Sequence, residues 1–223
     1  MRKKGKIKKT RVLLVLLIFI VFFYSVTKIF EAPQAAKMDN PITEVKKEIV
    51  AAFPNEVYGV PVKTELVELG TDGRPGTKRE IKYIVLHETG NFERGTDAEC
   101  HSLLLTENSQ DSTSWHYTVD DHEIYHHIPD DEIAWHAGDG SKPDGGNTCG
   151  IGIELCVNED GDFEKTFDNA ARLVAYLLNA YELDTSSIKK HGDFISKDCP
   201  NSIIKNNRMG EFVSKVEEYL AME

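Results

Sequence analysis

The sequence has too few cysteines to build a disulfide scaffold. Its 223 residues include only four, at positions 100, 149, 156 and 199, whereas small disulfide-stapled folds are dense in cysteine. If one of the four binds a metal, the other three allow at most one intrachain disulfide. Free cysteines are among the most buried residue types, so we expect reduced and partly buried thiols.

Basic residues are scarce beyond the first eleven positions. The formal net charge is −11, yet residues 1–11 contain seven Lys and Arg residues and no acid. The remainder has 19 basic and 37 acidic residues, a net charge of −18. Nucleic-acid binding depends on Lys and Arg contacts to phosphate, so we expect no nucleic-acid partner. The sequence also lacks internal repeats and low-complexity tracts, and its length suits one ordinary domain with an appendage.

One long apolar run, residues 12–26, follows the basic N-terminus, and it reaches residue 30 if Lys28 snorkels. A membrane-spanning helix needs ~20 residues, and the core of a signal peptide needs about 7–15. No cleavage site of the A-x-A type follows directly, so the pattern favours an uncleaved anchor. The basic cluster would stay in the cytoplasm. Residues 1–30 thus predict a single-pass protein of the cell membrane with an extracytoplasmic domain, or a secreted protein if the segment is cleaved.

The remaining sequence predicts a tether and one domain. Residues 31–56 contain small residues and prolines, with a possible stalk helix over residues 41–53, and the domain is expected over residues 57–223. Thr96 and Glu99 form a capping-box pattern at the start of a helix. Strands interspersed with helices predict an α/β fold with a mixed central β-sheet flanked by helices. The expected strands are a run ending at residue 87, a hairpin of residues 115–119 and 123–128, and residues 150–157; further helices are expected over 167–183 and 212–220.

Three residues form a candidate metal site. His191 and Cys199 lie at the two ends of a segment whose spacing requires a loop, and His87 ends the apolar run of residues 83–86. Imidazole nitrogen and thiolate sulfur both suit Zn²⁺, and three protein ligands plus water make an open, catalytic site. The end of a buried strand would hold His87 rigidly. We therefore expect Zn²⁺ bound by these three side chains.

Five motifs, in a fixed order, carry a resemblance to a known family. They are Tyr-Ile-Val-Leu-His-Glu-Thr-Gly at 83–90, Ser-Trp-His-Tyr-Thr-Val-Asp-Asp at 114–121, Ile-Ala-Trp-His-Ala-Gly-Asp-Gly at 133–140, Gly-Ile-Gly-Ile-Glu-Leu-Cys at 150–156, and residues 191–200. Over roughly residues 58–222 the chain resembles the zinc-dependent N-acetylmuramoyl-L-alanine amidases, the family of phage T7 lysozyme and the peptidoglycan recognition proteins. It is most similar to the amidases of bacilli and their phages. The resemblance implies peptidoglycan as substrate and cleavage of the amide between N-acetylmuramic acid and L-alanine.

Glu154 and Lys197 are the candidate catalytic residues. Glu154 stands between Ile153 and Leu155 in an apolar strand, where an ionised carboxylate is rarely buried without a partner. It is either a glutamate on the solvent side of an edge strand or a proton shuttle for water at the metal. The resemblance favours the shuttle, because the family has a catalytic glutamate at this strand position. Lys197 lies two positions before Cys199, where catalytic relatives also have a lysine. It is either an ordinary solvated lysine or a hydrogen-bond donor to the oxyanion that forms during amide hydrolysis.

The other histidines are assigned different roles. The resemblance places His136 at the rim of the cleft and implies contact with substrate or the transition state. His116 is expected to pack or to form hydrogen bonds. Trp115 occupies the position where some relatives have a tyrosine, so the resemblance does not carry a role of that tyrosine's phenol over to this chain. His101, His122, His126 and His127 are expected on the surface or on a strand face.

Two other functions remain open at this point. A peptidoglycan-binding module without catalysis is disfavoured by Cys199, because a weak ligand such as serine would be expected there. A structural zinc domain would need a fourth protein ligand, for example His116 or Cys156. The sequence predicts no particular oligomeric state.

Overall fold

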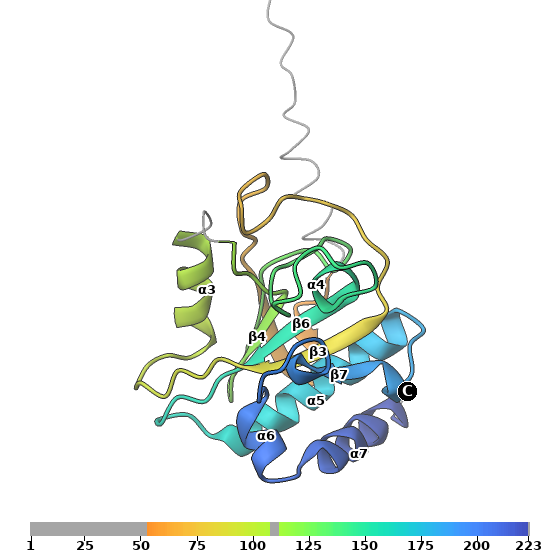
Figure 1. Ribbon diagram of the computed structural model, residues 1–223. Coiled ribbons are helices and arrows are strands. Elements are labelled where there is room, and N and C mark those ends of the chain that lie inside the picture. Colours follow the sequence, from red (N-terminus) through yellow and green to blue (C-terminus); the bar gives the residue numbers. More distant parts are fainter. Residues whose placement is uncertain (1–52, 108–111, 223) are drawn as a thin grey trace, which may run out of the picture. The chain divides into compact units, whose positions relative to one another are not determined.

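A seven-stranded mixed β-sheet lies at the centre of the computed structural model, which describes residues 53–107 and 112–222 (Figure 1). The strand order is β1-β2-β5-β4-β6-β3-β7. Strands β4, β6, β3 and β7 are parallel to one another, β2 and β5 are also parallel, and the β1–β2 and β4–β5 pairs are antiparallel. This arrangement confirms the predicted mixed sheet and its hairpin. The strands are β1 Glu56–Val57, β2 Val60–Thr64, β3 Tyr83–Glu88, β4 Tyr117–Val119, β5 Ile124–His126, β6 Gly150–Leu155 and β7 Ile188–Lys190.

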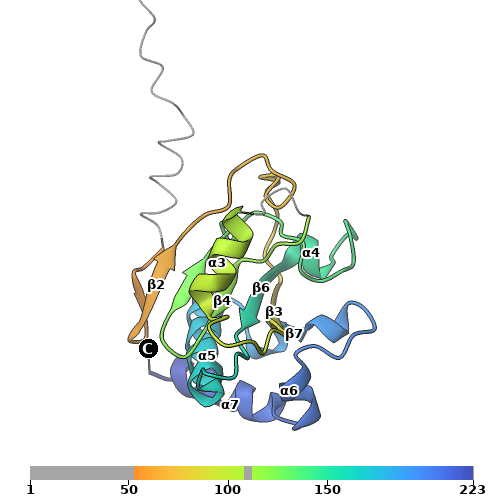
Figure 2. The same cartoon turned by 90° about the vertical axis from the view of Figure 1, so that its left-hand side faces the viewer.

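Helices cover both faces of the sheet. Helices α5 and α7 pack against each other, and α5 lies on β3, β4 and β6, whereas α3 packs on β4 and β5 (Figures 1 and 2). The predicted flanking helices are thereby confirmed. The helices are α3 Ala98–Glu107, α4 Gly146–Cys149, α5 Phe163–Ala180, α6 Asn201–Lys205 and α7 Met209–Leu220, with 3-10 turns η1 Thr185–Ser187 and η2 His191–Asp193.

Alternation along β3 and β6 separates the core from the site. Because successive side chains of a strand point to opposite faces, Ile84 and Leu86 share one face of the sheet with residues 151, 153 and 155 of β6, and all of them belong to the main core with α5 and α7. Burying each such side chain fully contributes ~1.5–3 kcal/mol. The opposite face carries His87 from β3 and positions 150, 152 and 154 from β6. One face of these two strands thus stabilises the fold, and the other is available for chemistry.

The first turn of α3 differs from the prediction by one residue. The side chain of Asp97 accepts the N–H of Cys100 at 3.0 Å, whereas the hydroxyl of Thr96 donates to the carbonyls of Asn91 and Glu93. Aspartate is at least as good an N-cap as threonine. The local capping-box pattern was therefore wrong about which residue caps the helix, although the helix itself is confirmed.

The N-terminal predictions lie outside the described residues. The apolar run of residues 12–30, most of the region 31–56 and nearly all of the possible stalk helix fall in residues 1–52. Within residues 53–107 and 112–222, no helix has both the length and the apolar character needed to cross a membrane. The first described residue, Phe53, packs its ring against Tyr117 and His126 of the sheet. The domain boundaries stay a prediction.

Candidate metal centre

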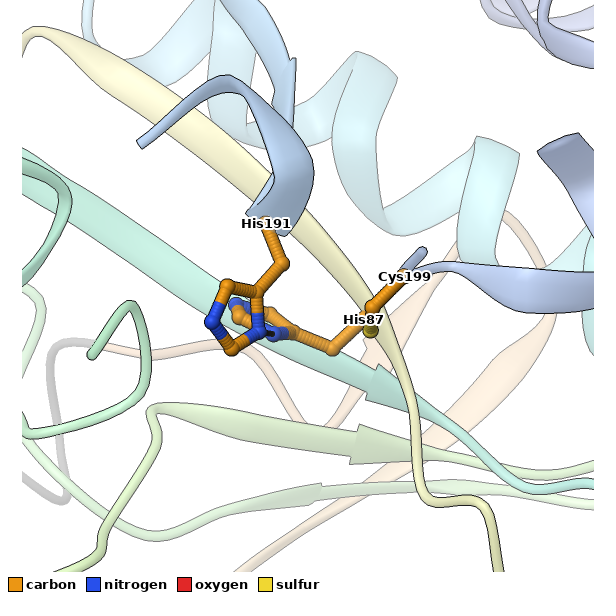
Figure 3. Close-up of side chains that lie close together, drawn as sticks. All are labelled: His87, His191 and Cys199. Carbon is orange, nitrogen blue, oxygen red and sulfur yellow. Dashed lines mark hydrogen bonds between the residues drawn. The ribbon is translucent and has the colours of Figure 1, made fainter. Parts of the chain in front are cut away.

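The three predicted ligands converge on one point. The donor atoms of His87, His191 and Cys199 all lie within 4.8 Å of one another, and the three residues are buried (Figure 3). The Nδ1 atoms of His87 and His191 face each other at 2.9 Å, a separation that a shared proton or a shared metal ion would bridge. Two imidazoles and a thiolate are a donor set that zinc prefers.

Strand pairing brings the two histidines together. Strand β7 pairs in parallel with β3, with Leu86 opposite Lys190. His87 is the residue after Leu86, and His191 is the residue after Lys190. Adjacent parallel strands lie about 4.8 Å apart, so the register alone places the two imidazoles as neighbours. The two histidines are 104 positions apart in sequence, and the segment between them includes β4, β5 and β6.

A close backbone contact shapes the segment between His191 and Cys199. The N–H of Gly192 donates to the carbonyl of Cys199 at 3.2 Å, and the N–H of Cys199 donates to the carbonyl of Lys197 at 3.0 Å. A Cβ atom on Gly192 would lie 2.7 Å from the carbonyl oxygen of Lys197. Glycine at 192 is therefore required by the approach of the chain that carries Cys199.

Glu88 fixes the other side of Cys199, and sequence reasoning missed it. Its carboxylate accepts the N–H of Ser202 at 3.0 Å, the Ser202 hydroxyl, and the N–H of Ile203 at 3.2 Å. These groups belong to the first turn of α6, which begins two residues after Cys199. A carboxylate at a helix N-terminus satisfies free N–H groups there. Since Glu88 follows His87 directly, one strand end holds both a candidate ligand, His87, and the segment that carries another candidate ligand, Cys199.

Glu154 lies beside the candidate ligand His87. In the register of β3 and β6 it is opposite His87, and its Oε1 is 3.9 Å from His87 Nδ1. Strand β6 lies between β4 and β3, so the alternative of a solvent-facing edge strand is wrong. The Oε2 atom is buried with no hydrogen-bond partner among the described residues. Burial, reinforced by Glu88 and opposed by Lys197, raises the pKa of Glu154 to about 8.

The ionisation of the ligands suits a metal site. Burial, followed by the nearby His136 and His191, holds the pKa of His87 well below its usual value. Burial and then Lys197 lower the pKa of His191 to about 4, so both imidazoles are neutral at pH 7. Burial raises the pKa of the Cys199 thiol to about 11. A metal ion would therefore displace one proton, from Cys199, on binding.

Lys197 is exposed, but its charge reaches the site. Besides its effects on Glu154 and His191, it opposes the burial-driven rise in the pKa of Cys199. Its role as an oxyanion donor stays a prediction.

His136 lies behind His87. Its Nδ1 is 3.0 Å from His87 Nε2, its Nε2 is 3.0 Å from the carbonyl oxygen of Gly150, and the residue is 6% exposed. A Cβ atom on Gly152 would be 2.5 Å from the His136 ring, so the glycine makes room for it. In the structure His136 is hydrogen-bonded to the candidate ligand His87. Contact of His136 with substrate stays a prediction.

The remaining histidines and cysteines do not complete the site. His116 accepts the N–H of Gly152 at 3.0 Å with Nδ1 and lies 2.9 Å from the carbonyl of Glu132 with Nε2, which confirms the hydrogen-bonding role expected for it. Neither His116 nor Cys156 belongs to the group of donors around His87 in the described part of the chain, so the structural zinc domain loses its fourth ligand. All four cysteines are free thiols, as expected. His122 is exposed and His126 lies on a strand, as predicted. His101 on α3 and His127, which follows β5, are buried, contrary to the prediction.

Comparison with known proteins decides the family. Residues 77–202, more than half of the chain, match the family model described as N-acetylmuramoyl-L-alanine amidase. The chain belongs to this amidase family. The matched span contains every residue of the site described above, from His87 to Cys199. The family is generally zinc-dependent, in agreement with the donor set.

Individual relatives of this amidase-family chain are also named N-acetylmuramoyl-L-alanine amidases. The amidase CwlH of Bacillus subtilis strain 168 is 40% identical over 145 residues, which is 65% of this chain and 57% of CwlH. XlyA of the same strain is 40% identical over 140 residues, 63% of this chain and 46% of XlyA. The chain thus spans about half the length of these curated relatives.

Solved structures share the fold. The catalytic domain of XlyA superimposes with a TM-score of 0.66 at 37% identity, covering 70% of this chain and 99% of that domain. The PlyG catalytic domain gives a TM-score of 0.64 at 28% identity, covering 72% of this chain and 96% of the other. The likeness therefore extends over the catalytic domains of both proteins.

Substituting Gly192 with alanine tests the loop geometry. The added Cβ would clash with the Lys197 carbonyl at 2.7 Å, so we expect the Cys199 segment to shift. Zinc affinity should then fall by ~10–100-fold, which is the usual loss when a residue that orients a metal ligand is changed. Gly210→Ala is the matched control, because nothing lies within 4 Å of its added Cβ on α7. Chelator competition measures both affinities. Equal affinities in the two variants would show that the close approach is unimportant.

Glu154→Gln tests the buried carboxylate through stability. The folded-state pKa of about 8 lies above the ordinary value of 4.5, so the ionised carboxylate opposes folding, and stability falls as pH rises from about 4.5 to about 8. In the zinc-free chain we expect Glu154→Gln to be more stable than the parent at pH 8, by ~1–4 kcal/mol, and nearly equal to it at pH 4.5. Urea unfolding at both pH values measures this difference. A variant that is less stable than the parent at pH 8 would contradict the assignment.

Proposed function

We propose that the chain is a peptidoglycan amidase that hydrolyses the amide between the lactyl group of N-acetylmuramic acid and L-alanine. The observation that carries the proposal is the half-buried carboxylate of Glu154. Its Oε1 is 3.9 Å from Nδ1 of His87, one of the three converging side chains, and its buried Oε2 lacks a partner among the described residues. The amidase names of the relatives support the choice of substrate.

His87, His191 and Cys199 would hold Zn²⁺ and leave a fourth coordination position open. When bound there, zinc lowers the pKa of a coordinated water and polarises a carbonyl. The chain's own residues do the rest of the work, because the sheet positions the candidate ligands and places the Glu154 carboxylate beside His87.

Glu154 carries the proton. It accepts a proton from water as the water oxygen bonds to the carbonyl carbon, and it returns that proton to the nitrogen as the carbon–nitrogen bond breaks. Burial raises the pKa of Glu154 in the zinc-free chain. A zinc ion beside it would lower that pKa again, because a nearby positive charge favours the ionised carboxylate. A carboxyl group that titrates near neutrality can act first as base and then as acid. Lys197 donates to the oxyanion that forms on the carbonyl oxygen.

The products of digestion test the proposed reaction. We expect the full chain, incubated with purified peptidoglycan, to release stem peptides that begin with free L-alanine, identified by mass spectrometry. New reducing sugars without new alanine termini would indicate a glycosidase instead. Sedimentation with the wall without any new termini would indicate a binding module.

Variants of the two catalytic candidates test their roles. Glu154→Gln keeps the size and polarity of the side chain but cannot shuttle a proton, so turnover should fall by ~10²–10⁴ while zinc content is kept. Lys197→Ala should lower turnover by up to ~10²–10³. Lys205→Ala, an exposed lysine at the end of α6, is the matched control. The two losses need not add, because both groups serve one transition state. Near-parent turnover in a zinc-loaded Glu154→Gln protein would reject the mechanism.

Residues 12–30 carry a separate proposal, that the domain works outside the cell while attached to the membrane. Burial of an apolar helix is insensitive to ionic strength, so the mature protein should stay in the membrane fraction through a high-salt wash. N-terminal sequencing of the mature protein checks the point. A soluble form that begins near residues 35–39 would show a cleaved signal peptide.

A further inference from the structure

We propose that His136 is a positioning residue that fixes the tautomer and the orientation of His87, so that Nδ1 of His87 is presented to the metal. The inference rests on the proposed zinc site. It assigns His136 a task that does not require it to touch the substrate.

A chain of three hydrogen-bonding groups leads from the sheet to the metal centre. The carbonyl of Gly150 faces His136 Nε2 at 3.0 Å, His136 Nδ1 faces His87 Nε2 at 3.0 Å, and His87 Nδ1 faces the site. The two rings meet edge to face, with centroids 5.0 Å apart and planes at 88°. The hydrogen-bond contact between His87 Nε2 and His136 Nδ1, rather than the angle between the rings, shows that a lone pair of one ring meets an N–H of the other.

Only one distribution of protons satisfies this chain. A carbonyl oxygen can only accept, so His136 Nε2 carries a proton and donates it to Gly150. A metal on His87 Nδ1 leaves the proton of that neutral ring on Nε2, which must then donate. His136 Nδ1 is the acceptor that it meets. Metal-ligating histidines commonly donate their second N–H in this way, and the partner sets ligand orientation and basicity.

The surroundings hold the His136 ring in place. On either side of it in sequence, the N–H of Trp135 donates to Ser114 Oγ at 3.1 Å and the N–H of Ala137 donates to Asn147 Oδ1 at 2.6 Å. The absent side chain of Gly152 supplies the space that the ring fills. A rigid acceptor behind His87 removes the rotational freedom that a strand-end imidazole would otherwise keep.

Two variants at one position separate the acceptor from the bulk of the ring. His136→Leu removes the acceptor and leaves the His87 N–H buried without a partner. In His136→Asn, the amide oxygen occupies the region of Nδ1 and can still accept. His127→Leu is the matched control, because it also removes a buried imidazole, one that lies against Thr118 and the rings of Trp115 and Tyr125.

Zinc affinity and the state of His87 are measured on the full chain. Chelator competition gives the affinity, and long-range ¹H–¹⁵N correlation spectra of the zinc-loaded protein show which ring nitrogen of His87 bears the proton. We expect His136→Leu to weaken zinc binding by ~10–100-fold and to lose the slowly exchanging Nε2 proton of His87. His136→Asn should restore most of the affinity, and His127→Leu should leave it at the parent value.

Three results would overturn the inference. One is a His136→Leu protein with parent affinity and an unchanged His87 spectrum, and another is a His136→Asn protein as weak as His136→Leu. The third is a parent spectrum with His87 bound through Nε2. A parent chain that binds no zinc would instead overturn the proposed function, and the inference with it, so the two failures are distinguishable.

Discussion

The parallel pairing of β3 with β6 on one side and β7 on the other is the interaction on which the site depends. It sets His87 beside Glu154 through one register and beside His191 through the other. The next residue of β3, Glu88, holds the first turn of α6 and so limits where Cys199 can lie. The end of β3 thus positions three other chain segments: β6, the segment that begins at His191, and the segment from Cys199 to α6. The farthest of these is more than a hundred residues away in sequence. A shift of one residue in either register would send these side chains to the opposite face of the sheet.

The face of β6 that serves the site is built at some cost to stability. Gly150 and Gly152 contribute no side chain to the packing there, and the half-buried Glu154 has its pKa raised to about 8. The opposite face carries apolar residues packed against α5. The alternation of a strand allows this division, since every second residue can be chosen for packing while the others are chosen for the metal centre. Natural proteins often accept local instability at functional sites in this way.

Residue chemistry and local pattern predicted the parts of the site that are visible in one segment. His87 was recognisable as a polar residue at the end of an apolar run, and Glu154 as a carboxylate inside a strand. Their pairing could not be predicted, because register is a property of two strands. Glu88 was missed because its partners at positions 202 and 203 are distant in sequence, and its type alone suggests an ordinary surface acid. Gly192 was missed because only the folded loop shows what its Cβ would meet. The capping of α3 was assigned to Thr96 rather than Asp97, since two good caps stood side by side.

X-ray absorption at the zinc edge on the full chain is the most direct test of the central claim, that two imidazoles and one thiolate gathered by β3 hold an open metal site. The account predicts one sulfur at about 2.3 Å and two imidazole nitrogens at about 2.0–2.1 Å, with the remaining position filled by a light atom from solvent. The sulfur contribution should vanish in Cys199→Ser. A zinc environment with four protein ligands, or one that keeps its sulfur in Cys199→Ser, would contradict it.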